Sequence, residues 1–183
     1  MSSTVDPVAQ PSAYQSMLLA LVGEVDPAAV QAATPSALHT VVAQAAEHLR
    51  SRPAPGEWSV IELVGHIADA EIVVSGRYRW ILAHDAPDIP PYDQDLWATR
   101  LRHQEADPGE LLAPFEALRA ANLKLWRRTP VEERARYGIH RERGRESYEL
   151  TFRLLAGHDR FHLDQARKTL ESVHRVGEES AAG

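Results

Sequence analysis

The 183-residue sequence contains no cysteine. This absence excludes disulfide bonds, zinc sites with thiolate ligands and a cysteine nucleophile. Any metal ion must therefore be held by histidine, aspartate or glutamate, and any thiol chemistry requires a thiol that arrives with a ligand. Histidine, by contrast, occurs nine times, so the chain has nitrogen ligands to offer.

Long apolar runs and an excess of positive charge are also lacking. No window approaches about 18 consecutive apolar residues, the length that indicates a membrane-spanning helix. The N-terminal stretch "MSSTVDPVAQPS" has neither the basic start nor the apolar segment of a secretory signal. The formal net charge of -6 argues against a nucleic-acid partner, which usually meets a basic face. We therefore expect a cytoplasmic protein with no membrane or nucleic-acid partner.

Helical periodicity of apolar residues runs through almost the whole chain, and no convincing alternating strand segment interrupts it. Four segments are long enough for bundle helices, and shorter helices are expected before and between them. The sequence predicts an all-α four-helix bundle with extra short N-terminal helices. The long helices are expected near 35–51, 59–84, 108–128 and 147–173, and the short ones near 12–22, 27–33 and 94–103.

Capping and proline signals set the expected boundaries. Ser59 and Glu62 have the spacing of a capping box, and Thr34-Pro35 is typical of a new helix start. The stretches "APDIPPYDQDLW" and "YGIHRERGRES" are rich in proline, glycine or charge and are predicted to be loops. We expect one helical-bundle domain with a disordered tail on each side; the expected ranges are 1–11 for the first tail, 12–174 for the domain and 175–183 for the second tail.

The stretch "AGHDRFHLDQ" places His158 and His162 four residues apart, one turn along the same helix face. Chance alone produces such a spacing often, but both histidines also fall in the middle of an apolar stripe. A buried polar group without a partner costs about 1–3 kcal/mol, and a divalent cation would supply the partner. Gln165 follows one turn later as a supporting hydrogen-bond partner. The alternative is a pair of core histidines bonded to a carbonyl or to Gln165.

A third ligand is available in "ELVGHIADAE", where His66 shares an inward face with apolar neighbours. Glu62 and Asp69 lie one turn to either side of His66. Either carboxylate can accept a histidine N–H or act as a catalytic base. Alternatively, both acids are surface residues at the helix margin, and capping already explains Glu62.

Other polar and aromatic residues carry weaker signals. Arg77 lies three turns beyond His66 on the same face and can meet an anion. Tyr92 and Trp97 lie in or just after the proline-rich loop and can line a pocket mouth. For all three residues a structural role, a satisfied salt bridge or a packed aromatic, is the favoured explanation. Three further histidines occur in polar surroundings and are expected to be exposed: His103, His140 and His174.

Two of these stretches together resemble a known family. "EWSVIELVGHIADAE" followed by "GHDRFHLDQAR" on a late helix resembles the DinB/YfiT-like superfamily over about residues 35–173. The resemblance implies an up-down-down-up bundle with a long connection between its second and third helices. It also implies a metal site made of His66, His158 and His162.

The family includes metal-dependent transferases and isomerases that use low-molecular-weight thiols such as mycothiol or bacillithiol. Three imidazoles leave an open position on Zn²⁺, Ni²⁺ or Fe²⁺, which is typical of a catalytic site. The resemblance favours an S-transferase that activates a thiol cosubstrate for attack on an electrophile. A metal-dependent hydrolase with Asp69 or Glu62 as base stays open, as does a non-catalytic metal- or partner-binding bundle of stress-response type. A bundle without metal and a homodimer are further alternatives.

Overall fold

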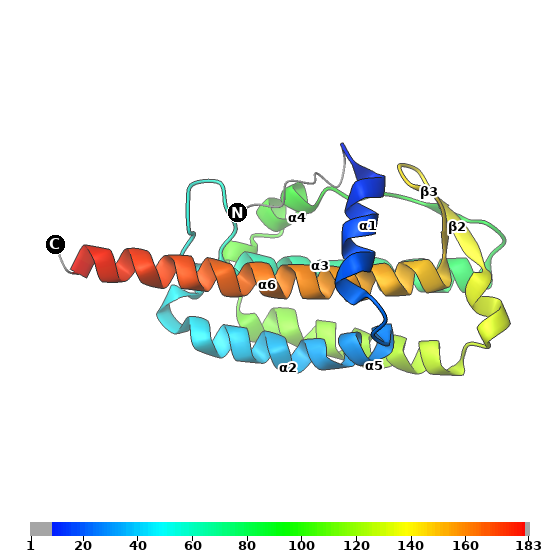
Figure 1. Cartoon of the computed structure of the whole chain (residues 1–183), viewed down its shortest axis with the longest axis horizontal. Coiled ribbons are helices and arrows are strands. Elements are labelled where there is room, and N and C mark those ends of the chain that lie inside the picture. Colours follow the sequence, from blue (N-terminus) through cyan, green and yellow to red (C-terminus); the bar gives the residue numbers. More distant parts are fainter. Residues whose placement is uncertain (1–8, 182–183) are drawn as a thin grey trace.

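A computed structural model of the protein describes residues 9–181. Six α-helices carry most of these residues, and a small sheet lies at one end of the molecule (Figure 1). The helices are α1 (Pro11–Val22), α2 (Pro27–Ala45), α3 (Val60–Ala83), α4 (Gln94–Arg100), α5 (Pro108–Arg128) and α6 (Tyr148–Ala181), and the strands are β1 (Asp88–Ile89), β2 (Tyr137–His140) and β3 (Gly144–Ser147).

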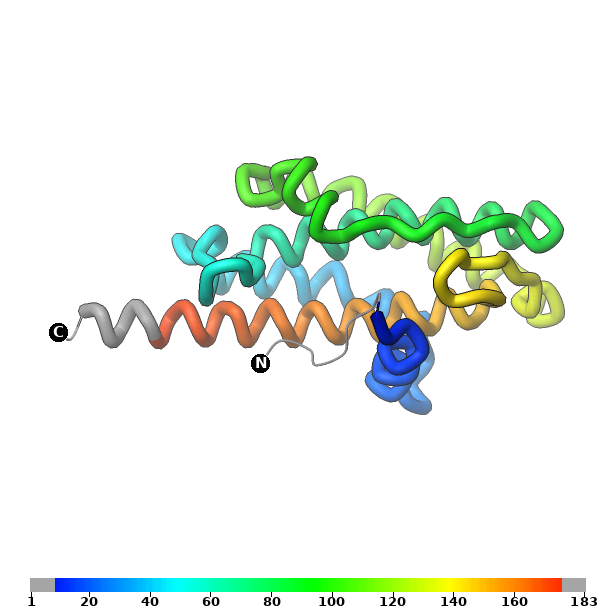
Figure 2. The backbone as a smooth tube through the Cα atoms, turned by 90° about the horizontal axis from the view of Figure 1, so that it is seen from above, coloured from blue at the N-terminus to red at the C-terminus, as the bar shows by residue number. Residues whose placement is uncertain are grey.

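Helices α2, α3, α5 and α6 form the expected four-helix bundle. Figure 1 shows α3 and α5 running in one direction and α2 and α6 in the other, which is the up-down-down-up order. Because α3 and α5 are consecutive bundle helices that run in the same direction, the chain between them must travel back along the bundle. Residues 84–107 form this long connection along one side of the bundle (Figure 2). The short α1 packs across α6 rather than along it.

The first bundle helix is longer than the sequence predicts. Residues 27–45 form one continuous helix with Pro35 inside it, not a short helix followed by a new one. A proline within a helix leaves the carbonyl four residues earlier without its donor. Here that carbonyl belongs to Gln31, and Arg119 Nη1 donates to it at 2.9 Å. A tertiary contact therefore replaces the missing helical hydrogen bond.

The prediction that "YGIHRERGRES" is a loop is wrong, because β2 and β3 form an antiparallel hairpin there. Gly144 turns the chain with φ of 74°. The two-residue β1 joins β2 in parallel and completes a three-stranded sheet. A Cβ atom on Gly138 would lie 2.6 Å from Ile89 Cγ1, so the glycine allows β1 to pack closely. Strands this short and charged carry no apolar alternation for a pattern to detect.

The ends of the chain differ from the expected tails. Pro11 already belongs to α1, and residues 1–8 lie outside the described part. At the other end α6 continues to Ala181, so only the last two residues of the expected 175–183 tail fall beyond the described structure. Within residues 9–181, no single helix is long and apolar enough to cross a membrane. Residues 11–22 and 27–50 together have the required length and composition, but the chain bends by 86° between them.

A buried polar network ties the four bundle helices together. Arg119 on α5 is 1% exposed and forms ion pairs with Glu71 on α3 and Asp159 on α6. Asn122 donates to Glu71 at 2.7 Å, and Gln31 on α2 donates to a backbone carbonyl of α6. Because every buried charge here has a partner, the network holds the helices in register instead of destabilising the core.

Candidate metal centre

Three histidine side chains converge between α3 and α6. His66 Nε2 lies 2.8 Å from His158 Nε2 and 3.1 Å from His162 Nε2. His66 and His162 are buried, and His158 is half-buried. Among the described residues these three form a group whose ligand atoms all lie within 4.8 Å of one another. The sequence-predicted trio is therefore brought together, with the same ring nitrogen of each imidazole directed at one point.

The surroundings keep these imidazoles neutral and oriented. Burial lowers the pKa of His66 and of His158 well below the usual range, and neighbouring histidines lower both further. Burial also lowers the pKa of His162 to about 4, although its hydrogen bond to Gln165 opposes the shift. Gln165 Oε1 lies 2.9 Å from His162 Nδ1 and accepts a hydrogen bond from the Nδ1–H, which leaves the Nε2 lone pair free. The expected supporting role of Gln165 agrees with this contact.

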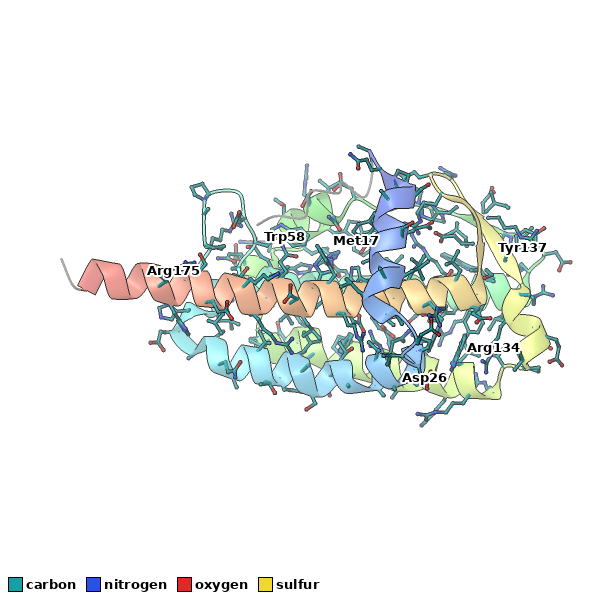
Figure 3. All side chains as sticks on the ribbon, viewed as in Figure 1. Met17, Asp26, Trp58, Arg134, Tyr137 and Arg175 are labelled. Atoms are coloured by element: carbon teal, nitrogen blue, oxygen red, sulfur yellow. The ribbon has the colours of Figure 1, made fainter. Side chains whose placement is uncertain are left out.

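Aromatic rings enclose the histidines. The Trp58 ring lies 5.1 Å from the His66 ring, and the Phe161 ring lies 4.9 Å from the His162 ring. Tyr14 on α1 packs edge-on against Phe161. Figure 3 shows Trp58 and Met17 on the side of α6 opposite α2. These rings limit the water around the imidazoles and strengthen electrostatic interactions there.

The two carboxylates expected beside His66 are engaged elsewhere. Glu62 completes the capping box with Ser59 and also pairs with Arg52. Asp69 Oδ2 lies 2.6 Å from His103 Nε2, so its partner is His103 and not His66. The predicted base or supporting role of these acids at the metal stays a prediction, but neither carboxylate belongs to the three-histidine group.

The expectation that His103 and His140 are exposed is wrong. His103 is 3% exposed and packs against Gly65, where a Cβ atom would meet its ring at 2.5 Å. His140 is 1% exposed in β2, while His174 is exposed as expected. The glycine within α3 is the one local hint of a close neighbour, but nothing in the sequence identifies His103 as that neighbour.

A groove of about 1140 Å³ runs past the histidines, with α3 and α6 as its floor. Its rim comes from α1, the loops before α3 and α4, and the β2–β3 hairpin, all on the side away from α2 and α5 (Figure 1). Of the three substrate contacts that the sequence suggests, Arg77 and Tyr92 line the groove. Trp97 does not line it and packs instead against Tyr92, with ring centroids 4.9 Å apart.

Several known proteins are similar to this chain. A protein of Oceanobacillus iheyensis described as a candidate metal-dependent hydrolase is 26% identical over 127 residues, which covers 69% of this chain and 72% of the relative. A protein of Geobacillus kaustophilus with the same description is 32% identical over 100 residues, covering 52% of this chain and 56% of the relative.

Similarity in structure points the same way. The solved structure of YfiT from Bacillus subtilis, described as a probable metal-dependent hydrolase with an unusual four-helix bundle topology, aligns with a TM-score of 0.70 at 21% identity. The alignment covers 97% of this chain and 93% of that one, and it shows a shared fold. The model of the DinB superfamily matches residues 15–166, most of the chain. This chain therefore belongs to the DinB superfamily.

Proposed function

We propose that this protein is a metal-dependent S-transferase that uses a low-molecular-weight thiol of the mycothiol or bacillithiol type against an electrophilic substrate. His66, His158 and His162 would hold a divalent transition metal, Zn²⁺ or Ni²⁺ first and Fe²⁺ as a third choice. The observation that carries the proposal is the convergence of three Nε2 atoms, two from buried and one from a half-buried histidine, on one point beside a groove.

The donor set fits such an ion. Three neutral nitrogen ligands without a fourth protein ligand are typical of catalytic sites with an open position. His158 Nδ1 is buried without a hydrogen-bond partner among the described residues, while its Nε2 points at the other two rings. A bound ion of this kind lowers the pKa of a thiol or of water at its open position.

The side chains around the histidines would prepare the site for this chemistry. Gln165 holds the His162 ring in the tautomer that presents its Nε2 lone pair. Trp58 and Phe161 exclude water from two of the imidazoles and leave the groove as the approach. A thiol and an electrophile bound side by side need more room than one small substrate, and a groove of about 1140 Å³ provides it.

Thiol transfer is favoured over hydrolysis because both carboxylates that the sequence suggests as a base, Asp69 and Glu62, are engaged by other side chains. Among the described residues, the histidine group contains no carboxylate. A thiol held at the open position would lose its proton to solvent and would need no protein base. Hydrolysis is the second candidate, because the relatives are described as candidate metal-dependent hydrolases. A non-catalytic metal-binding bundle, a homodimeric state and a cytoplasmic location stay predictions.

Metal content tests the first half of the proposal. Protein purified without a histidine tag is expected to contain about one Zn or Ni per chain by elemental analysis. His158→Ala is expected to lose that metal, and His84→Ala, which removes an exposed imidazole at the end of α3, is expected to keep it. Equal metal content in the wild type and His158→Ala would refute the site.

Product analysis tests the second half. The metal-loaded protein is incubated with bacillithiol or mycothiol and a model electrophile such as monochlorobimane, and with ester and amide substrates in parallel. Thiol adducts detected by mass spectrometry, formed faster than in the His158→Ala control, support the transferase. Turnover of the esters or amides alone would instead support the hydrolase, and no turnover of either would support a binding protein.

A further inference from the structure

Arg77 is a buried cation without a compensating carboxylate. Its side chain is 6% exposed, yet among the described residues no aspartate or glutamate forms an ion pair with it. Its Nη2 donates to the Pro90 carbonyl at 3.0 Å, and its Nε is buried without any hydrogen-bond partner. An unpaired buried charge is costly, so a partner outside the chain is the simplest reason for it.

Other arginines in the protein show what compensation looks like. Arg119 has two carboxylates, and Arg143, which also lines the groove, forms two hydrogen bonds with the buried Glu146. The charge of Glu146 raises the pKa of Arg77 but is outweighed by burial, and among the described residues Glu146 forms its ion pair with Arg143 and not with Arg77. Glu142, whose charge also raises the pKa of Arg77, is exposed at the hairpin turn. Burial and the nearby Arg143 lower the pKa of Arg77 to about 10, so it is still charged at neutral pH.

His140, which lies beside Arg77, cannot accept hydrogen bonds from both of the donors that face it. Its Nε2 lies 3.4 Å from Arg77 Nη2, and its Nδ1 lies 3.3 Å from the backbone N–H of Glu142. Both neighbours are donors, but a neutral imidazole has only one accepting nitrogen. One donor at this point therefore lacks an acceptor, and an oxygen atom of a bound anion could supply it.

The position of Arg77 in the groove relates it to the histidines. It follows His66 by eleven residues on α3, which is the same face about 16 Å along the axis. The side chain of a helical residue leans toward the helix N-terminus, here toward His66. Between the two positions the groove is lined by apolar side chains of α3 and α6: Ala70, Val74, Leu154 and Leu155.

We propose that Arg77 and His140 form a subsite for the anionic end, carboxylate or phosphate, of an elongated ligand whose apolar middle crosses the groove and whose reacting group meets the three histidines. This assignment rests on the proposed function in taking the groove as the substrate site. The ligand would need a spacer on the order of 10 Å between its anion and its reacting group. Small anions without such a spacer would gain only the contacts to Arg77 and His140.

Binding to metal-free protein tests the subsite apart from any activity. Octanoate, octyl phosphate and the neutral octanamide are titrated calorimetrically into chelator-treated wild-type protein. Octanoate or octyl phosphate is expected to bind roughly 10- to 100-fold more tightly than octanamide, the range expected for hydrogen bonds to a charged group. The tighter of the two anions identifies the headgroup. Equal affinity of the wild type for all three ligands would overturn the proposal.

Two variants locate the binding site. Arg77→Gln is expected to weaken the preferred anion by the same factor and to leave octanamide unchanged. Arg175→Gln, which removes an exposed guanidinium at the opposite end of the groove, is expected to change neither. Loss of anion affinity in Arg175→Gln but not in Arg77→Gln would refute the assignment. Circular dichroism checks that both variants fold. If Arg77→Gln does not fold, the affinities of the wild-type protein for the two anions and for octanamide still test the proposal.

Failure of the Arg77 subsite can be distinguished from failure of the proposed metal-dependent function. Chelator-treated protein needs no metal, so a chain that never binds Zn or Ni can still show the anion preference. Conversely, protein that binds one metal per chain but shows no anion preference would keep the metal centre and lose only the Arg77 subsite.

Discussion

Gly157→Ala should raise the helix propensity of α6 but create a steric clash with α1, so its local and tertiary effects on stability have opposite signs. Gly157 lies inside α6, next to His158, at the point where α1 crosses that helix (Figure 1). An alanine Cβ at this position would lie 2.2 Å from the Leu18 carbonyl oxygen and 2.7 Å from its carbonyl carbon. Both atoms belong to the backbone of α1, so no side-chain rotation can relieve the contact.

The size of the effect follows from two opposing contributions. Replacing glycine by alanine in a helix interior stabilises by about 0.8–1.0 kcal/mol. Overpacking a well-filled contact costs about 1–3 kcal/mol, and here all of α1 must move to relieve it. That shift would disturb the packing of Leu18 and Val22, which are 4% and 1% exposed. Because the whole helix must shift, we expect a cost in the upper half of that range, about 2–3 kcal/mol, and therefore a net loss of about 1–2 kcal/mol in the free energy of unfolding.

Urea unfolding followed by circular dichroism measures the difference. Gly76→Ala on α3 is the matched control, because its Cβ would lie 3.5 Å or more from the Trp80 ring, an ordinary contact. It is expected to stabilise the protein by about 0.5–1 kcal/mol. If Gly157→Ala is as stable as the wild type or more stable, α1 does not cross α6 as closely as described. Destabilisation by Gly76→Ala as well would mean that the contact with α1 is not the cause.

Three further predictions concern the core, the metal ligands and pH. Arg119→Met leaves two buried carboxylates unpaired and is expected to cost about 3–5 kcal/mol in urea unfolding; a loss below about 1 kcal/mol would contradict the buried network. Gln165→Leu removes the acceptor of one ligating imidazole and is expected to weaken metal binding about 10- to 100-fold in a chelator competition, with unchanged helical content. Burial and the nearby arginines lower the pKa of His140 from 6.5 to about 4, so in this window the unfolded chain binds more protons than the folded one. Stability should therefore fall as the pH drops from about 6.5 to about 4, and His140→Asn should flatten that part of the profile; an unchanged slope would refute the assignment.

The helices themselves were predictable because their signals are local. Ser59 and Glu62 form the capping box that their spacing predicts, and Asp107 caps α5 with Pro108 in the first turn. Pro35 shows where this reasoning fails. A proline in sequence indicates a helix start, but the helix continues because Arg119, which is 84 positions away, satisfies the freed carbonyl. No local pattern contains that contact.

At the candidate site, too, some features follow from local sequence patterns and others depend on tertiary contacts. The central place of His158 and His162 on an apolar face, and of His66 on another, depends only on helical periodicity, so the sequence by itself predicted the three-histidine group. The pairing of Asp69 with His103 depends on how the long return after α3 folds back over Gly65.

Arg77 shows most clearly how much of the site depends on tertiary packing. The sequence placed it on the His66 face of α3, because helical periodicity fixes the direction of a side chain. It did not place Arg77 beside His140, which comes from a hairpin that the pattern missed. Burial and the lack of an acidic partner depend on all the elements that close the groove. Periodicity therefore determined which residues face inward, and tertiary packing decided which of them meet.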